Sequence, residues 1–149
     1  MFKSLGYTLI ALLLTTSNGW SAAHCELIPK NWQPNLDPLK ADMEQSLAQA
    51  KDQQAILSNS LHLADITDTQ LFMVYIQLLQ SLDSNQRATL VKEQQRWLQE
   101  RSSHANAAVK STDSSLATLE AANARKNLSE ERLTQLLQRL QYLDSHCPQ

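Results

Sequence analysis

Apolar residues recur at intervals of three and four along most of the chain, which is the spacing of one face of an α-helix. The clearest example is residues 86–101, where Leu90, Gln94, Trp97 and Arg101 fall on a single face. A glutamine and an arginine within an apolar stripe need hydrogen-bond partners if they are buried. We therefore expect residues 86–101 to form the central helix, with the neighbouring helices supplying those partners.

The pattern before this stretch predicts two helices separated by a loop. Asp37 is suited to be the N-cap of the first helix, with Pro38 at its first position, and the apolar stripe fades near Leu57. Residues 59–67 have no regular period, so we expect a loop there. Asp68 can then cap a second helix. Its apolar face comprises Leu71, Val74, Tyr75, Leu78 and Leu82.

The region around and after the central stretch is less clearly divided. Ser84 is expected to cap the helix that contains it. From 102 to 115 the apolar pattern weakens, and the sequence leaves open whether the helix continues or breaks near residues 111–115. The stripe resumes at Leu116, so at least one further helix follows.

A last helix is predicted from Ser129 as N-cap, with Leu128 and Leu133 placed to form a hydrophobic staple. Its full apolar face comprises Leu133, Leu136, Leu137, Leu140 and Leu143. The chain therefore predicts an all-α fold, a small bundle of four to five helices.

The first 23 residues are expected to be a cleaved signal peptide. Lys3 precedes an apolar run of about ten residues, too short to span a bilayer, and small residues end at Ala23. A lipoprotein anchor at Cys25 is the competing interpretation, but His24 stands where that signal needs a small residue. We expect an exported, periplasmic protein with no transmembrane segment in the mature chain.

The mature chain divides into an extended lead, residues 24–36, and a helical domain, residues 37–149. Its two cysteines, Cys25 and Cys147, stand near the two ends, and in an oxidising compartment such a pair is most simply a disulfide that ties the termini together. A redox-active thiol is the alternative, but the sequence has no Cys-x-x-Cys spacing.

Composition argues against most enzyme classes. Both glycines, Gly6 and Gly19, lie in the signal peptide, so phosphate loops, dinucleotide fingerprints and nucleophile elbows are not expected. The histidines show no metal-binding spacing and no serine has an evident activating base, so we expect no metal, no cofactor and no catalytic residue. Without the signal peptide, 12 basic side chains face 15 acidic ones, which disfavours nucleic acid and is compatible with a basic protein partner.

Two motifs stand out in the helical region. The first is Leu71-x3-Tyr75 followed by Leu90-x3-Gln94-x2-Trp97-x3-Arg101, and the second is Ser129-x2-Arg132-x3-Leu136. Together they resemble the signature of the lysozyme inhibitor LprI-like family of exported bacterial proteins. The resemblance covers roughly residues 71–143. It implies a helical fold in which these residues form a structural cluster.

Four positions depart from the family pattern. Phe72 stands where the family usually has asparagine, and Ser102 where it usually has aspartate. Ala105 and Ala124 replace two common cysteines, which is consistent with a family disulfide replaced here by the pairing of the terminal cysteines.

The resemblance implies a protein that binds and inhibits a partner, such as a c-type lysozyme or another cell-wall hydrolase. Asp65, in the expected loop at residues 59–67, and Asp113, in the segment 111–115, are the candidate partner contacts, because an acid there could enter a basic cleft. A non-catalytic structural or accessory module of the bacterial envelope is the alternative. The residues alone do not decide between the two.

Overall fold

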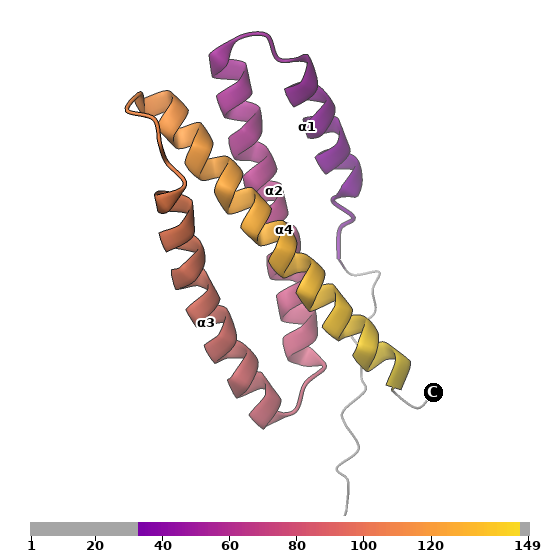
Figure 1. Ribbon diagram of the computed structural model, residues 1–149. Coiled ribbons are helices and arrows are strands. Elements are labelled where there is room, and N and C mark those ends of the chain that lie inside the picture. Colours follow the sequence, from indigo (N-terminus) through magenta and orange to yellow (C-terminus); the bar gives the residue numbers. More distant parts are fainter. Residues whose placement is uncertain (1–32, 147–149) are drawn as a thin grey trace, which may run out of the picture.

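The structure, a computed structural model, describes residues 33–146, and these contain four α-helices and no strand. In chain order the helices are α1 (Asp37–Gln49), α2 (Gln53–Gln80), α3 (Ser84–Ala107) and α4 (Ser114–His146) (Figure 1). The predicted all-α fold is confirmed. The predicted signal peptide, most of the extended lead and both cysteines lie outside the described residues.

The first helix begins where it was predicted but ends earlier. Leu36, not Asp37, is the N-cap residue, and the Asn35 side chain accepts a hydrogen bond from the Asp37 amide (3.0 Å). The helix ends at Gln49 because Ala50 is extended, and Asp52 then caps the next helix by accepting from the Ala55 amide (2.8 Å). A helix reaching Leu57 was therefore a wrong prediction.

The predicted loop at residues 59–67 was also wrong, since α2 runs through it without a break. Ser60, Ala64 and Thr67 are buried at helical spacing, in line with Leu71. This face is made of small residues, which let another helix pack close, so hydrophobicity alone did not reveal it. Asp68, the expected cap, lies in the middle of α2.

The turn between α2 and α3 has a capping box. Asp83, rather than the predicted Ser84, is the N-cap, and its side chain accepts from the amides of Asn85 and Gln86 (2.9 Å each). The Gln86 side chain accepts in return from the Asp83 amide (3.2 Å). This turn fixes where the central helix α3 starts.

The last helix is longer than predicted. Of the two possibilities for residues 102–115, the structure shows the break: α3 ends at Ala107, and α4 starts at Ser114. The Asp113 side chain caps α4 by accepting from the Leu116 amide (2.9 Å). A second start at Ser129 was wrong, because Ser129 is fully buried in the middle of α4.

The four helices pack unevenly. Figure 1 shows α4 crossing α2, with α3 to one side, and α4 packs most extensively along α2 and less along α3. Between α2 and α3 themselves there is almost no close backbone contact. The apolar core at their junction with α4 consists of Leu71, Leu78, Leu82, Leu90, Leu136 and Leu140.

Helix α1 is peripheral. It packs against α2, and none of its residues is buried. Its polar links to the rest of the fold include Lys40 Nζ to Glu130 of α4 (2.8 Å) and the Gln70 side chain to Asp37 (3.0 Å). Within residues 33–146, no helix is long and apolar enough to cross a membrane.

Candidate functional site

Three helices meet at a hydrogen-bonded cluster of Asp68, Arg101 and Ser129. Arg101 Nη1 donates to Asp68 Oδ1 (2.6 Å) and to the Ser129 hydroxyl oxygen (2.9 Å), and that hydroxyl donates to Asp68 Oδ1 (2.6 Å). Each residue comes from a different helix, α2, α3 and α4 respectively. Charge-assisted hydrogen bonds restrict distance and direction more strictly than apolar packing does. This cluster therefore fixes how the three helices are positioned relative to one another.

A second polar contact lies one turn away. Arg132 Nε donates to Gln94 Oε1 (3.2 Å), Nη1 donates to Gln135 (3.3 Å), and Nη2 lies 3.9 Å from Glu93. Burial lowers the pKa of Arg132, and the carboxylate of Glu93 opposes that effect. Arginine is so strong a base that its guanidinium remains charged at neutral pH.

Trp97 lies between these two contacts along α3. Its ring centroid is 4.8 Å from the guanidinium carbon of Arg101 and 5.9 Å from that of Arg132. Both distances are within the range of cation–π attraction. The half-buried indole also packs against the apolar core, so it joins the core to the charged cluster.

A groove runs between α2 and α3 and has a volume of about 370 Å³. Leu71, Phe72 and Tyr75 of α2 and Val91, Gln94 and Leu98 of α3 line most of it, and none of its lining residues belongs to α4. It is therefore the side of the α2–α3 pair that α4 leaves open. Asp68 and Arg101, the charged pair described above, also contribute to its wall.

The phenol of Tyr75 borders this groove. Burial raises its pKa, while the positive charge of Arg132 acts in the opposite direction. The hydroxyl is thus a neutral group near pH 7 that can donate or accept a hydrogen bond at the groove wall.

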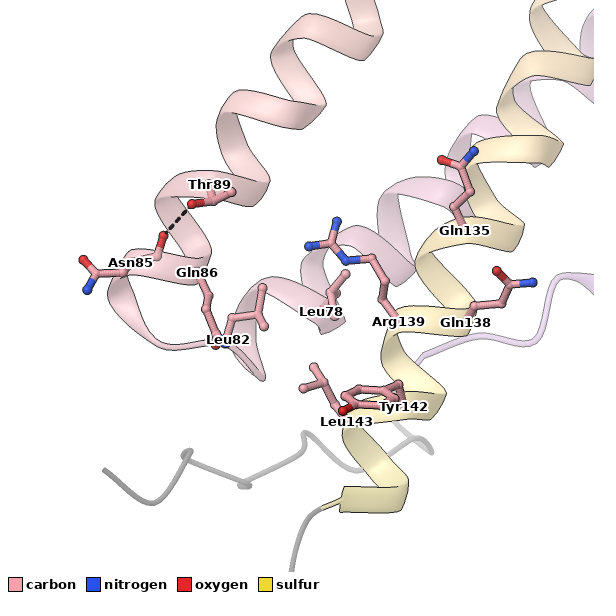
Figure 2. A pocket seen from close by; sticks show the side chains of 10 residues that line it. All are labelled: Leu78, Leu82, Asn85, Gln86, Thr89, Gln135, Gln138, Arg139, Tyr142 and Leu143. Atoms are coloured by element: carbon pink, nitrogen blue, oxygen red, sulfur yellow. Dashed lines mark hydrogen bonds between the residues drawn. The ribbon is translucent and has the colours of Figure 1, made fainter. Parts of the chain in front are cut away.

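A larger cavity of about 710 Å³ lies at one end of the bundle (Figure 2). Figure 2 shows Leu78, Leu82 and Leu143 on its apolar side, and polar side chains of α3 and α4 around them. Arg139 at its rim pairs with Glu93 (2.6 Å). The cavity arises where the C-terminal end of α4 and the start of α3 separate above the α2–α3 turn.

The connection between α3 and α4 is held by one carboxylate. Glu120 of α4 accepts hydrogen bonds from the backbone amides of Lys110 (2.7 Å) and Ser111 (3.0 Å). These hydrogen bonds lower the pKa of Glu120. The connection is therefore ordered by a side chain that reaches back from the next helix.

A family model described as lysozyme inhibitor LprI matches residues 43–136, more than half of the chain. The chain belongs to the LprI family. Neither a curated protein nor a solved structure matches it significantly. The matched region begins inside α1 and ends within α4, so it contains the whole of α2 and α3, the charged cluster and the groove.

The LprI signature residues are brought together by the fold. Leu71, Leu90 and Leu136 are buried in the core, and Tyr75 and Trp97 pack against it. The polar members are connected as described above, Gln94 to Arg132 and Arg101 to residues of the other two helices. In this structure the signature residues thus form the junction of α2, α3 and α4.

The two candidate partner contacts lie at different places. Asp65 is on α2, 70% of its side chain is exposed, and it pairs with Arg125 of α4 (2.8 Å). Asp113 caps α4. Arg125 follows Asp113 by twelve residues, or about 18 Å of helix, so the two carboxylates do not mark a single small surface.

Sequence reasoning missed the partners of Arg101. Asp68 was interpreted as a helix cap and Ser129 as another, because both residue types favour caps. The available signal was the spacing of Ser60, Ala64, Thr67 and Leu71, which continues the second helix through the supposed loop. With α2 continuous, Asp68 would have been recognised as an acid within a helix that needs a basic partner.

Residues 33–146 contain no group of three or more histidine, cysteine, aspartate or glutamate residues placed to hold a metal ion. The described residues provide a rigid polar junction, an open groove beside it, and an exposed carboxylate nearby.

Proposed function

We propose that this protein binds a lysozyme and inhibits its action on the bacterial cell wall. The observation that carries the proposal is the match of the LprI inhibitor model to residues 43–136. A c-type lysozyme is the first partner to test, and another cell-wall hydrolase is the next. The role is non-catalytic, since inhibition requires only that the enzyme be held in a state that excludes its substrate.

The geometry supports an inhibitor that binds as a preformed body. Asp68, Arg101 and Ser129 lock three helices together, so the surface next to them does not have to be ordered on binding. Preorganised partners lose less conformational entropy on association, and inhibitors of enzymes commonly bind with little backbone change.

Export belongs to the same proposal. An inhibitor protects the cell wall only where lysozyme reaches it, and cleavage of the predicted signal peptide after Ala23 would place residues 24–149 in the periplasm. The support is the sequence pattern of residues 1–23. Mass spectrometry of the periplasmic protein tests it, and a mature N-terminus other than His24 would contradict the assigned cleavage site.

The decisive experiment measures the turnover of bacterial cell walls by a c-type lysozyme with increasing amounts of purified residues 24–149. We expect inhibition that is complete near an equimolar ratio. Cell-wall turnover unchanged at a large excess of the protein would reject the proposal for this class of enzyme.

The same assay tests the proposed contact at Asp65. Because 70% of this side chain is exposed, Asp65→Asn removes a charge without opening the core, and we expect inhibition to weaken about fivefold, roughly the effect of one exposed interfacial ion pair. Asp42→Asn is the matched control, because Asp42 is an exposed acid on peripheral α1. Equal inhibition by both variants would remove Asp65 from the contact. The second candidate, Asp113, is tested as Asp113→Asn, which retains the cap of α4.

An accessory role in the envelope is the second candidate function. The end cavity favours it, because its apolar side is large enough to hold a chain segment or a small ligand. Loss of envelope integrity on deletion of the gene, in cells not exposed to lysozyme, would support this role over inhibition.

A further inference from the structure

The open side of the α2–α3 pair carries large apolar side chains that the fold does not use. Phe72 is 60% exposed and Leu98 is 41% exposed, and both border the same groove from opposite helices. Their neighbours Leu71 and Leu90 on the same two helices are almost fully buried against α4. An exposed aromatic ring beside an apolar hollow is typical of a binding surface, because aromatic side chains are enriched in the buried cores of protein interfaces.

The floor of the groove is rigid. Gln94 is buried and accepts a hydrogen bond from Arg132, and Arg101 donates hydrogen bonds to Asp68 and Ser129 of the neighbouring helices. The groove therefore keeps its shape without a ligand. A side chain entering it would meet a preformed pocket, which favours affinity because little has to be immobilised.

The α2 edge beside the groove carries one exposed acid, Asp65, about one turn before Asp68 on the same helix. The charge of Asp68 is compensated within the fold, because Asp68 pairs with Arg101 (2.6 Å) and lies 3.7 Å from Arg125. Asp65 pairs with Arg125 (2.8 Å), but 70% of its side chain is exposed and can be approached from solvent. A cationic group of a partner would be attracted to this edge while an apolar group fills the hollow.

The groove is a better candidate for the partner-binding surface than the larger end cavity. All of its lining residues fall within the matched region, residues 43–136. The end cavity depends on Gln138, Arg139, Tyr142 and Leu143, which lie beyond it. The groove therefore lies in the region that matches the family model, whereas Phe72 itself stands where the family usually has asparagine and is a feature of this chain.

We propose that the groove between α2 and α3 is the surface that holds the lysozyme, with Phe72 as its central contact. This inference rests on the proposed function and names its contact site. The matching part of the enzyme is an apolar side chain next to a lysine or arginine, which would occupy the hollow and the acidic α2 edge respectively.

The test compares the binding of a c-type lysozyme to three single variants by titration calorimetry. Phe72→Ala and Leu98→Ala each remove an exposed apolar side chain at the groove, and we expect Kd to rise at least tenfold for Phe72→Ala and about threefold for Leu98→Ala. Leu116→Ala is the matched control, since Leu116 is 42% exposed but does not line the groove, and we expect less than a twofold change. Circular dichroism and Tm verify that each variant folds.

A photo-crosslinking side chain at position 72 gives an independent measurement. Crosslinking to lysozyme from position 72, with none from position 116, supports the groove. Wild-type affinity in the Phe72→Ala variant, or equal crosslinking from the two positions, overturns it even if the protein inhibits lysozyme.

Two further results would also overturn the proposal, and each can be distinguished from wild-type affinity or equal crosslinking. If the wild-type protein neither binds nor inhibits lysozyme, the proposed function fails and the assigned partner fails with it. If wild-type protein is a dimer and Phe72→Ala is a monomer, the groove is occupied by a second copy instead, which light scattering detects.

Discussion

Helices α4 and α1 both pack against α2, and they are attached in different ways. On the side of α4, α2 buries Ser60, Ala64, Thr67, Leu71 and Leu78, and it shares the ion-paired junction with α3 and α4. Helix α1 has no buried residue, and its polar links are Asp37 to Gln70 of α2 and Lys40 to Glu130 of α4. The comparison indicates that α2, α3 and α4 are the stable unit. It also explains why the family match can begin within α1, at residue 43.

The largest expected effect concerns the chain ends. We propose that Cys25 and Cys147, which lie outside the described residues, form a disulfide. Gln33 donates to the Met73 carbonyl, while Asp37 contacts Gln70, so the chain approaches α1 from the C-terminal end of α2. That is also the end where α4 finishes, one residue before Cys147.

Replacing both cysteines by serine should lower the free energy of unfolding by about 4 kcal/mol, because the bond would close a loop of more than 100 residues. Urea unfolding of the two proteins measures the difference. Thiol labelling of the native exported protein is the control, and two reactive cysteines would show that the bond is absent.

The next prediction concerns the stable unit formed by α2, α3 and α4. Trp97→Ala should cost about 3 to 5 kcal/mol of unfolding free energy, because it removes a large side chain that packs on the core and contacts two guanidinium groups. Leu98→Ala, at the adjacent exposed position, should cost less than about 1 kcal/mol. Chemical denaturation of both variants is the measurement, and similar losses would mean that Trp97 is not a core residue.

The smallest effect tests how α1 is attached. Burial raises the pKa of Glu130, but hydrogen bonds from Lys40 and Lys126 outweigh it, so the pKa lies below the usual 4.5. The stabilisation is therefore fully present above pH 4.5 and is lost as the pH falls through the folded-state pKa. Because both partners are partly exposed, we expect less than about 1 kcal/mol.

Hydrogen exchange at pH 6 and pH 3 measures this attachment after correction for intrinsic exchange rates. Protection of α1 amides should decrease at pH 3, while protection of amides near Leu90 should change less. In Glu130→Gln the pH dependence of α1 protection should be reduced. Unchanged α1 protection in the wild-type protein would show that the ion pair does not hold this helix.

The sequence predicted helices well where the packing surface is apolar. The spacing of Leu90, Gln94, Trp97 and Arg101 predicted the central part of α3, although not where the helix ends, and indicated that two polar side chains needed partners. It failed where small polar residues pack, because Ser60, Thr67 and Ser129 have the local preferences of loops and caps while tertiary contacts bury them in helices. Which acid faces Arg101 depends on the crossing of α2, α3 and α4, and no local pattern contains that information.

Each connection between the helices is closed by a carboxylate side chain. Asp52, Asp83 and Asp113 cap the helices that follow, Glu120 holds the longest connection, and no described residue has positive φ. A turn with a left-handed backbone usually requires glycine. An N-cap position requires only a short side chain with an acceptor oxygen, so asparagine, serine or threonine can replace aspartate there. The connections between the helices therefore tolerate substitution, and their sequences can diverge between relatives while the helices stay in place.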